Sequence, residues 1–191
     1  MSADAAIRSD LGTLPFDVFV SRWILERVPH VFSSDLNAYL AWKHALGARI
    51  GVDPRAIVLV GSAATGFSLN PNRALRPFTA ASDIDVAVVS PHHFDIVWRW
   101  LRNLGAERYG YPRYVQDQID DHRERLLYWG AIATDRLLQY TPLGKEWIPA
   151  LADVAKTLPG GTRDVNVRLF REFEALRAYQ MNGCGKVRST L

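Results

Sequence analysis

Two short stretches of the chain carry residues that could do phosphate chemistry with a metal ion. Gly61 and Ser62 directly follow an apolar run over 56–60, and Asp83 and Asp85 stand at the start of the next apolar run. Alternate residues of a strand point to one face, so the two carboxylates should lie side by side. Close carboxylates repel unless a cation separates them, and Mg²⁺ or Mn²⁺ accepts such oxygen ligands. Because glycine lets the backbone approach a phosphate and serine can donate to its oxygens, the pattern predicts a site for a metal-bound nucleotide.

A third stretch could add another carboxylate to this pair. The sequence RDVNVRLF (163–170) alternates polar and apolar residues, which predicts a half-buried strand. Asp164, Asn166 and Arg168 share one face of that strand. Asp164 is the only carboxylate on this face, and we therefore predict it as the third acid. If Asn166 occupies the critical place instead, the catalytic base would be weakened or missing.

The elements that must position these residues are strands under heavy helical cover. The runs AIVLV (56–60) and IDVAVV (84–89) are short and β-branched, which is typical of buried strands. Amphipathic periodicity indicates helices between and around them. The first helix is opened by Thr13 and Pro15 and ended by Pro29, and the second runs from a cap at Ser33 or Ser34 to about Ile50. Four more helices are predicted from Ser90-Pro91 to Gly105, from about Tyr114 to Gln139, over Gly144 to Ala155 and over roughly 171–181.

This element order predicts an α/β (α+β) fold with a small mixed sheet of about three to four strands. The length suits a single domain over 1–191, with a core at about 55–170. N-terminal helices (14–50) and a C-terminal helix (171–183) complete it. The polar tail (184–191) contains Gly-Cys-Gly, which predicts fraying.

Composition limits the class of protein. The chain has 191 residues, 48% hydrophobic residues and a formal net charge of +3, which favours a folded core over disorder and does not require a polyanionic partner. One cysteine excludes an internal disulfide framework. The chain shows no signal-peptide pattern and no apolar run long enough for a membrane span. We therefore expect a cytoplasmic protein without a membrane partner.

The ordered combination of these motifs resembles the nucleotidyltransferase superfamily of DNA polymerase β type. The matching residues are IVLVGS (57–62) and SDIDVAVV (82–89). The resemblance covers about 35 residues directly, and it extends more loosely to a third strand on which that family carries another carboxylate. The spacer between the two motifs is longer here, and it includes an inserted loop with Arg73 and Arg76.

The resemblance implies a polymerase-β-like fold and a transfer reaction. An acceptor hydroxyl would attack the α-phosphorus of a nucleoside triphosphate such as ATP, with release of pyrophosphate. Asp83 and Asp85 would hold the metal ions, and Asp164 would complete the metal site or take the acceptor's proton. The acceptor could be a protein, an RNA or a small molecule. Small bacterial members of the superfamily often belong to toxin–antitoxin or defence modules.

The resemblance also assigns nucleotide-binding roles. Gly61 and Ser62 would hold the triphosphate, and Arg168 would offset charge on the transferring group. A different interpretation is a catalytically degenerate relative that binds a nucleotide or a partner protein without turnover. A dehalogenase-type phosphatase is disfavoured because the residues before Asp83 are not apolar, and a P-loop is disfavoured because GSAATG contains no lysine.

Overall fold

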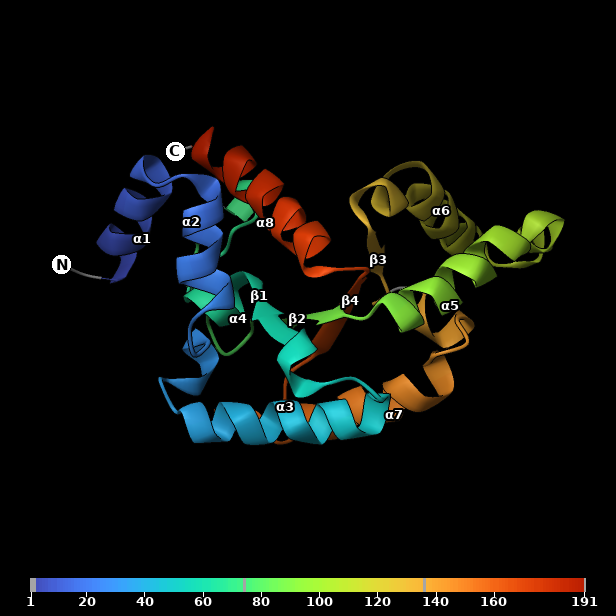
Figure 1. Ribbon diagram of the computed structural model, residues 1–191, viewed down its shortest axis with the longest axis horizontal. Helices are drawn as coiled ribbons and strands as arrows, with labels where there is room; N and C mark the ends of the chain where they lie inside the picture. The colour runs from blue at the N-terminus through green and yellow to red at the C-terminus, as the bar shows by residue number, and fades with distance from the viewer. Residues whose placement is uncertain (1–2, 74, 136, 191) are drawn as a thin grey trace.

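The core of the protein is one mixed β-sheet. A computed structural model describes residues 3–73, 75–135 and 137–190. These residues form a four-stranded sheet in the order β1-β2-β4-β3 (Figure 1). β2 and β4 run parallel, and each outer strand is antiparallel to its neighbour. The strands are β1 (Ile57–Val60), β2 (Ile84–Val89), β3 (Ala131–Ala133) and β4 (Val165–Phe170).

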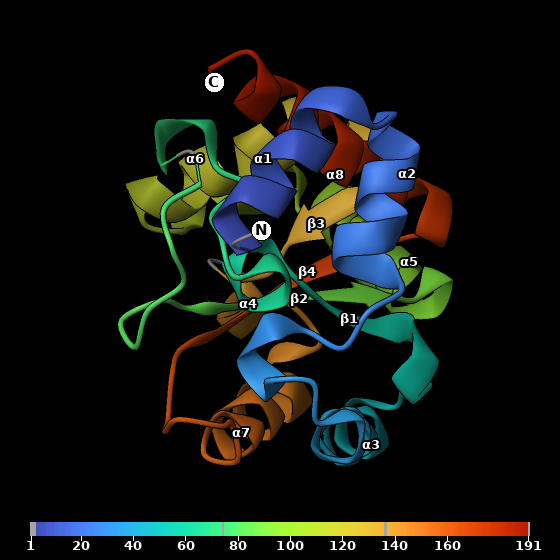
Figure 2. The same ribbon diagram turned by 90° about the vertical axis from the view of Figure 1, so that its left-hand side faces the viewer.

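Helices cover both faces of this sheet, which confirms a mixed α+β architecture. Figure 2 shows α3 and α7 on one side of the strands and α1, α2 and α8 on the other. The α-helices are α1 (Ala3–Thr13), α2 (Phe16–Val20), α3 (Leu36–Ile50), α4 (Gly61–Thr65), α5 (Pro91–Asn103), α6 (Arg113–Asp121), α7 (Gly144–Ala155) and α8 (Phe173–Arg188). Shorter helical turns are η1 (Ser21–Leu25), η2 (His30–Phe32), η3 (Pro54–Ala56), η4 (Pro71–Arg73), η5 (Gly105–Gly110), η6 (His122–Leu126), η7 (Leu127–Trp129) and η8 (Leu138–Tyr140).

The alternation of β2 divides the interior into two hydrophobic clusters. Ile84, Val86 and Val88 pack with buried residues of α3, α5 and α7. Ala87 and Val89, on the opposite face, pack with buried residues of α1, α2 and α8. The face that carries Ala87 also carries Asp85, because residues two apart on a strand share a face. The candidate carboxylates therefore belong to the side of the sheet covered by α8.

Local capping explains where two helices begin. The Ser90 side chain accepts a hydrogen bond from the His93 amide and so caps α5, as predicted. The predicted cap of α3 at Ser33 or Ser34 is wrong. Asp35 caps that helix by accepting from the Ala38 amide at 2.9 Å. Ser33 has a left-handed φ of 48°, so the backbone is still turning there.

The predicted helix over 114–139 is wrong in its second half. α6 ends at Asp121, and Gly130 adopts a φ of +60°, which stops the helical path and starts β3. A buried histidine joins the two segments. The His122 Nδ1–H donates to the Gln118 carbonyl at 2.6 Å, and its Nε2 accepts from the Ala133 amide at 3.0 Å. Burial lowers the pKa of His122, so the ring is a neutral structural group.

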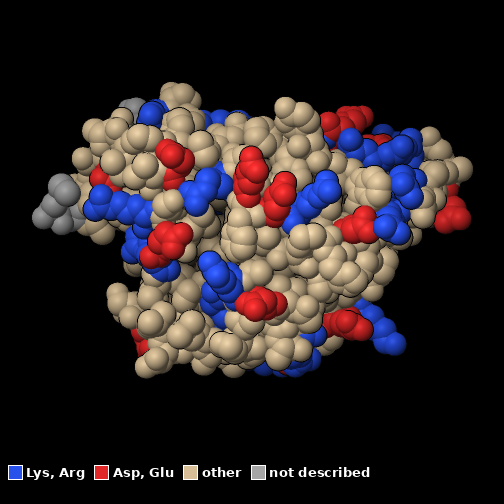
Figure 3. Space-filling model, in the orientation of Figure 1, with Lys and Arg blue, Asp and Glu red and all other residues tan. Residues whose placement is uncertain are grey.

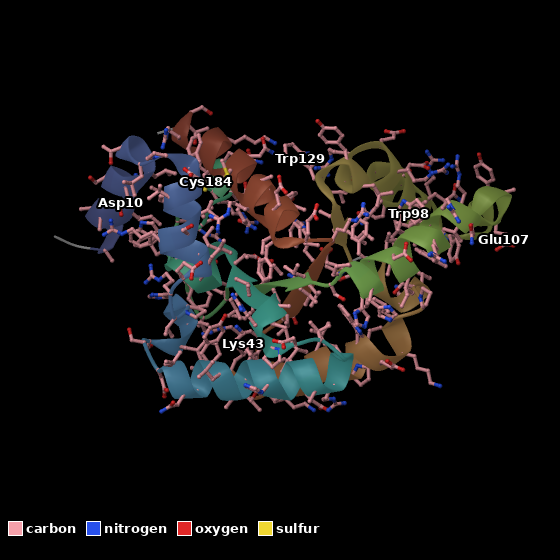
Figure 4. The ribbon with its side chains drawn as sticks, in the orientation of Figure 1. Asp10, Lys43, Trp98, Glu107, Trp129 and Cys184 are labelled. Carbon is pink, nitrogen blue, oxygen red and sulfur yellow. The ribbon has the colours of Figure 1, made fainter. Side chains whose placement is uncertain are left out.

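The predicted fraying of the C-terminal tail is also wrong. α8 continues to Arg188, and Cys184 is fully buried on it (Figure 4). Arg188 donates from Nε and Nη2 to the carbonyls of Leu11 and Leu14, both at 2.6 Å. Packing against α1 and α2 thus outweighs the weak helix propensity of the two glycines. Burial also raises the pKa of Cys184 to about 12, which makes the thiol inert.

Among the described residues, no helix is both long and apolar enough to cross a membrane.

Candidate functional site

The predicted site residues meet at one end of the sheet. Val60 pairs with Asp85 across β1 and β2, and Asp85 pairs with Asn166 across β2 and β4. Gly61 follows Val60 directly, as the first residue of α4. The fold therefore places the Gly-Ser turn, the second aspartate of the pair and the polar face of β4 in one row across adjacent strands.

Gly61 lies directly against the carboxylate of Asp85. Its φ is +61°, and a Cβ added there would stand 2.8 Å from Asp85 Oδ2. An L-residue with a side chain is strained at this φ, and the carboxylate leaves no room for one. Glycine is therefore required both by the turn and by the neighbouring acid. Thr65 stabilises the same turn locally, since its hydroxyl donates to the Phe67 carbonyl at 2.6 Å.

Asp83 and Asp85 lie close enough for their charges to interact. Both residues are exposed, yet the elements around Asp85 bury its carboxyl group in part. The pKa of Asp85 is raised to about 6: burial raises it most, the nearby charge of Arg168 lowers it, and the charges of Asp83 and Asp135 raise it by smaller amounts. A carboxyl group that is surrounded by protein and still accessible to water is expected in a concave site. A cation there would favour the ionised form.

Arg168 lies near the carboxylates but does not neutralise them directly. Its guanidinium donates to the Tyr179 hydroxyl of α8 and stacks 4.8 Å from the centre of that ring. Its Nε is buried without a hydrogen-bond partner in the described structure. Among the described residues, no ion pair within 4.0 Å involves Asp83 or Asp85. The positive charge is thus held beside the acids while their oxygens stay open for other ligands.

The two candidates for the third acidic position lie beside different members of the pair. Asn166 is the register partner of Asp85. Asp164 precedes β4, and its carbonyl accepts from the Ile84 amide at 2.9 Å. Asp164 and Asp83 both line one hollow of about 250 Å³. The carboxylate of the predicted third acid therefore accompanies Asp83, and an amide accompanies Asp85.

One acidic residue near the site was missed from sequence. Asp135 follows β3, and its charge contributes to the raised pKa of Asp85. The antiparallel register pairs Ala133 with Arg168, and the Thr134 amide donates to the Val167 carbonyl at 3.2 Å. Continued by two residues, this register brings Asp135 level with Asn166. The signal that could have revealed it is Gly130, which interrupts the helical pattern just before the apolar triplet of β3.

The donor set fits a hard cation that takes part of its coordination from water or phosphate. In the described ranges, no three or more histidine, cysteine or acidic side chains form a group that could hold a metal by themselves. Mg²⁺ is commonly held by one or two carboxylates together with substrate phosphates and water. Asp83 and Asp85 could supply that minimal set, with Asp164 beside the first of them.

The described residues of the inserted loop between the two motifs form a short ribbon. Phe67 and Pro77 form a β-bridge, and the Ser68 amide donates to the Arg76 carbonyl at 2.8 Å. Leu75 anchors the ribbon by burying its side chain in the cluster beneath α8. Arg73 and Arg76 are exposed, so both side chains remain available to a charged ligand.

No protein-family model, no curated protein and no solved structure matches this chain. The case for its activity therefore depends on the geometry of its own residues.

Proposed function

We propose that the protein is a Mg²⁺- or Mn²⁺-dependent nucleotidyltransferase with a polymerase-β-like fold. It would move a nucleoside monophosphate from a nucleoside triphosphate to a hydroxyl acceptor and release pyrophosphate. The single observation that carries this proposal is the contact between Gly61 and Asp85. A turn that can only be glycine lies against one acid of an exposed, same-face pair. A turn with a purely structural role needs no such acid.

The residues have distinct roles in this reaction. The backbone at Gly61 and the hydroxyl of Ser62 bind the triphosphate, whose tail would lie beside the acid pair. Asp83 and Asp85 hold the cation, which neutralises the triphosphate and stabilises the attacking and leaving oxygens. Arg168, fixed by the Tyr179 hydroxyl, offsets negative charge on the transferring group.

A transfer assay tests the proposal directly. The purified protein is incubated with Mg²⁺, each α-labelled nucleoside triphosphate and a soluble cell extract as the source of acceptors. We expect pyrophosphate release and label transfer from the wild type, and neither from Asp83→Ala. Release that persists in Asp83→Ala would refute the assigned metal site.

One observation favours a second candidate, a degenerate module that binds nucleotide without turnover. The register partner of Asp85 is an amide, Asn166, where an active site of this type would be expected to place its base. In that case nucleotide binds to the wild type, and no acceptor yields pyrophosphate.

Where the wild type is active, the variant Asp164→Asn tests whether Asp164 serves as the third acid. If Asp164 serves beside Asp83 as the third acid, the loss of its charge should lower transfer by about 10²–10⁴-fold, the usual range for one general acid–base group. Nucleotide affinity should change little. The matched control is Asp17→Asn, which makes the same change at an exposed carboxylate of α2 and should retain activity. Equal losses in both variants would mean that Asp164 has no special role.

A further inference from the structure

A cavity of about 540 Å³ lies next to the site, between α7 and the first half of β4. Its apolar wall includes Leu138, Ile148 and Leu151, and its polar side includes Gln139, Asp164 and Asn166. β3 pairs with the stretch 168–170 of β4 and Thr134 extends the bonding to the Val167 carbonyl, so the edge of β4 before Val167 is left to face this cavity. The space therefore follows from the shortness of β3.

The cavity adjoins the proposed transfer site. Asp164 also lines the smaller hollow that contains Asp83, and Thr162 and Arg163 are shared by the two. Asn166 lines the cavity and is the register partner of Asp85. The cavity lies under α7, which covers the face of the sheet opposite to Asp83 and Asp85. Asp164 and Asn166, at the edge of β4, join it to the side of the acids, on the side of the row away from Gly61.

The chemistry of the lining disfavours a phosphate-rich occupant. Of the described lining residues, Arg163 alone carries a positive charge. Its guanidinium is already placed over the Phe78 ring at 5.0 Å and donates to the Ala80 and Pro159 carbonyls, each at 3.4 Å. The remaining polar groups are carboxylates, amides and a hydroxyl, which pair with hydroxyl or ammonium groups. Among the described lining residues, neither the nucleotide's own triphosphate nor an RNA backbone finds a matching partner.

The charge distribution on the surface and the size of the cavity also favour a small-molecule occupant. Figure 3 shows basic and acidic side chains interspersed over the displayed face, without the single-sign field that attracts a nucleic acid. Small-molecule sites are concave, mostly apolar and of about 300–1,000 Å³, with a few polar groups that fix orientation. The observed cavity has this size and this division into an apolar wall and a polar side.

We propose that this cavity binds the acceptor of the reaction, and that the acceptor is a small hydroxylated molecule, neutral or cationic, with one apolar face. This inference rests on the proposed function and narrows its acceptor from three classes to one. The apolar face would lie on Leu151 and Ile148 of α7. A hydroxyl would then be held near Asp164, toward the α-phosphorus of the nucleotide.

The test fills the cavity without touching the acid pair. Ala152 is an exposed residue of α7 that lines the cavity, and Ala152→Trp would occupy part of it. Ala45→Trp makes the same change at an exposed position of α3 and is the matched control. A second variant, Ile148→Asp, places a charge on the apolar wall. Thermal melting of the three variants checks that each one is folded.

The acceptor probes are three fractions of one soluble cell extract: metabolites that pass an ultrafiltration membrane, protein and RNA. Each fraction is titrated with Mg²⁺ and α-labelled nucleoside triphosphates. We expect wild-type label in the metabolite fraction, and Ala152→Trp should need about tenfold more of that fraction for half-maximal rate at an unchanged KM for the nucleotide. Ile148→Asp should behave alike, and Ala45→Trp should match the wild type.

The outcomes separate this inference from the proposed function. Label in the protein or RNA fraction, or metabolite labelling that neither cavity variant impairs, would overturn the acceptor assignment and leave the transferase intact. No label and no pyrophosphate with any fraction would overturn the transferase itself, and the acceptor assignment with it.

Discussion

Asp85→Asn is expected to abolish nucleotidyl transfer without destabilising the fold. The change keeps the size of the side chain but removes the charge that would bind the cation. Stabilisation of the reacting oxygens by a metal is worth several kcal/mol, so transfer should fall by about 10³-fold, at 1.36 kcal/mol for each factor of ten. Single-turnover label transfer measures the loss. Asp17→Asn, at an exposed carboxylate of α2, is the control and should retain full activity.

The pH dependence of the stability of Asp85→Asn should reveal the raised pKa of Asp85 in the wild type. Folding raises the pKa of Asp85 from 3.8 to about 6, so the folded state disfavours the ionised form. Without metal, Asp85 should therefore contribute a decrease in the free energy of unfolding as pH rises from about 4 to about 6, which is measured as the difference between the wild type and Asp85→Asn. Asparagine does not titrate, so Asp85→Asn should lack this decrease and should be at least as stable as the wild type at pH 7. Denaturant unfolding at several pH values checks it, and a variant clearly less stable at pH 7 would contradict the interpretation.

The strands and the acid pair were accessible from sequence because their signals are local. β2 has the predicted bounds, and β1 differs from the prediction by a single residue. The period of two in a strand predicted a common face for Asp83 and Asp85 from local sequence alone. The α7 bounds were likewise predicted, since its apolar stripe is continuous.

The missed features depend on contacts between distant residues. β3 is a triplet that pairs with β4 some 35 residues away in sequence, and a triplet is too short to show a period. Its omission hid Asp135 from the site. The contact between Gly61 and Asp85, too, required the register of β1 on β2. In α8 the tertiary bonds of Arg188 decided the outcome against local propensity.

Gly61→Ala is expected to cause a large loss in the rate of transfer and only a modest loss in the free energy of unfolding. The φ of +61° strains any L-residue with a side chain at a cost of about 1–2 kcal/mol. In addition, the new methyl group would stand 2.8 Å from Asp85 Oδ2 and force that carboxylate to move. A displacement of about 1 Å at a reacting centre can cost about 10²-fold in rate, which is the loss we expect in single-turnover transfer.

A second glycine of the same chain separates strain from displacement. Gly51 has a φ of +68°, and a Cβ added there meets nothing within 4 Å. Gly51→Ala should therefore lose a similar free energy of unfolding, about 1–2 kcal/mol, and keep its transfer rate. If the two variants lose stability and activity alike, the loss at Gly61 is a general effect of strain, and its contact with Asp85 has no catalytic meaning. If only Gly61→Ala loses activity, the turn acts through the carboxylate it touches.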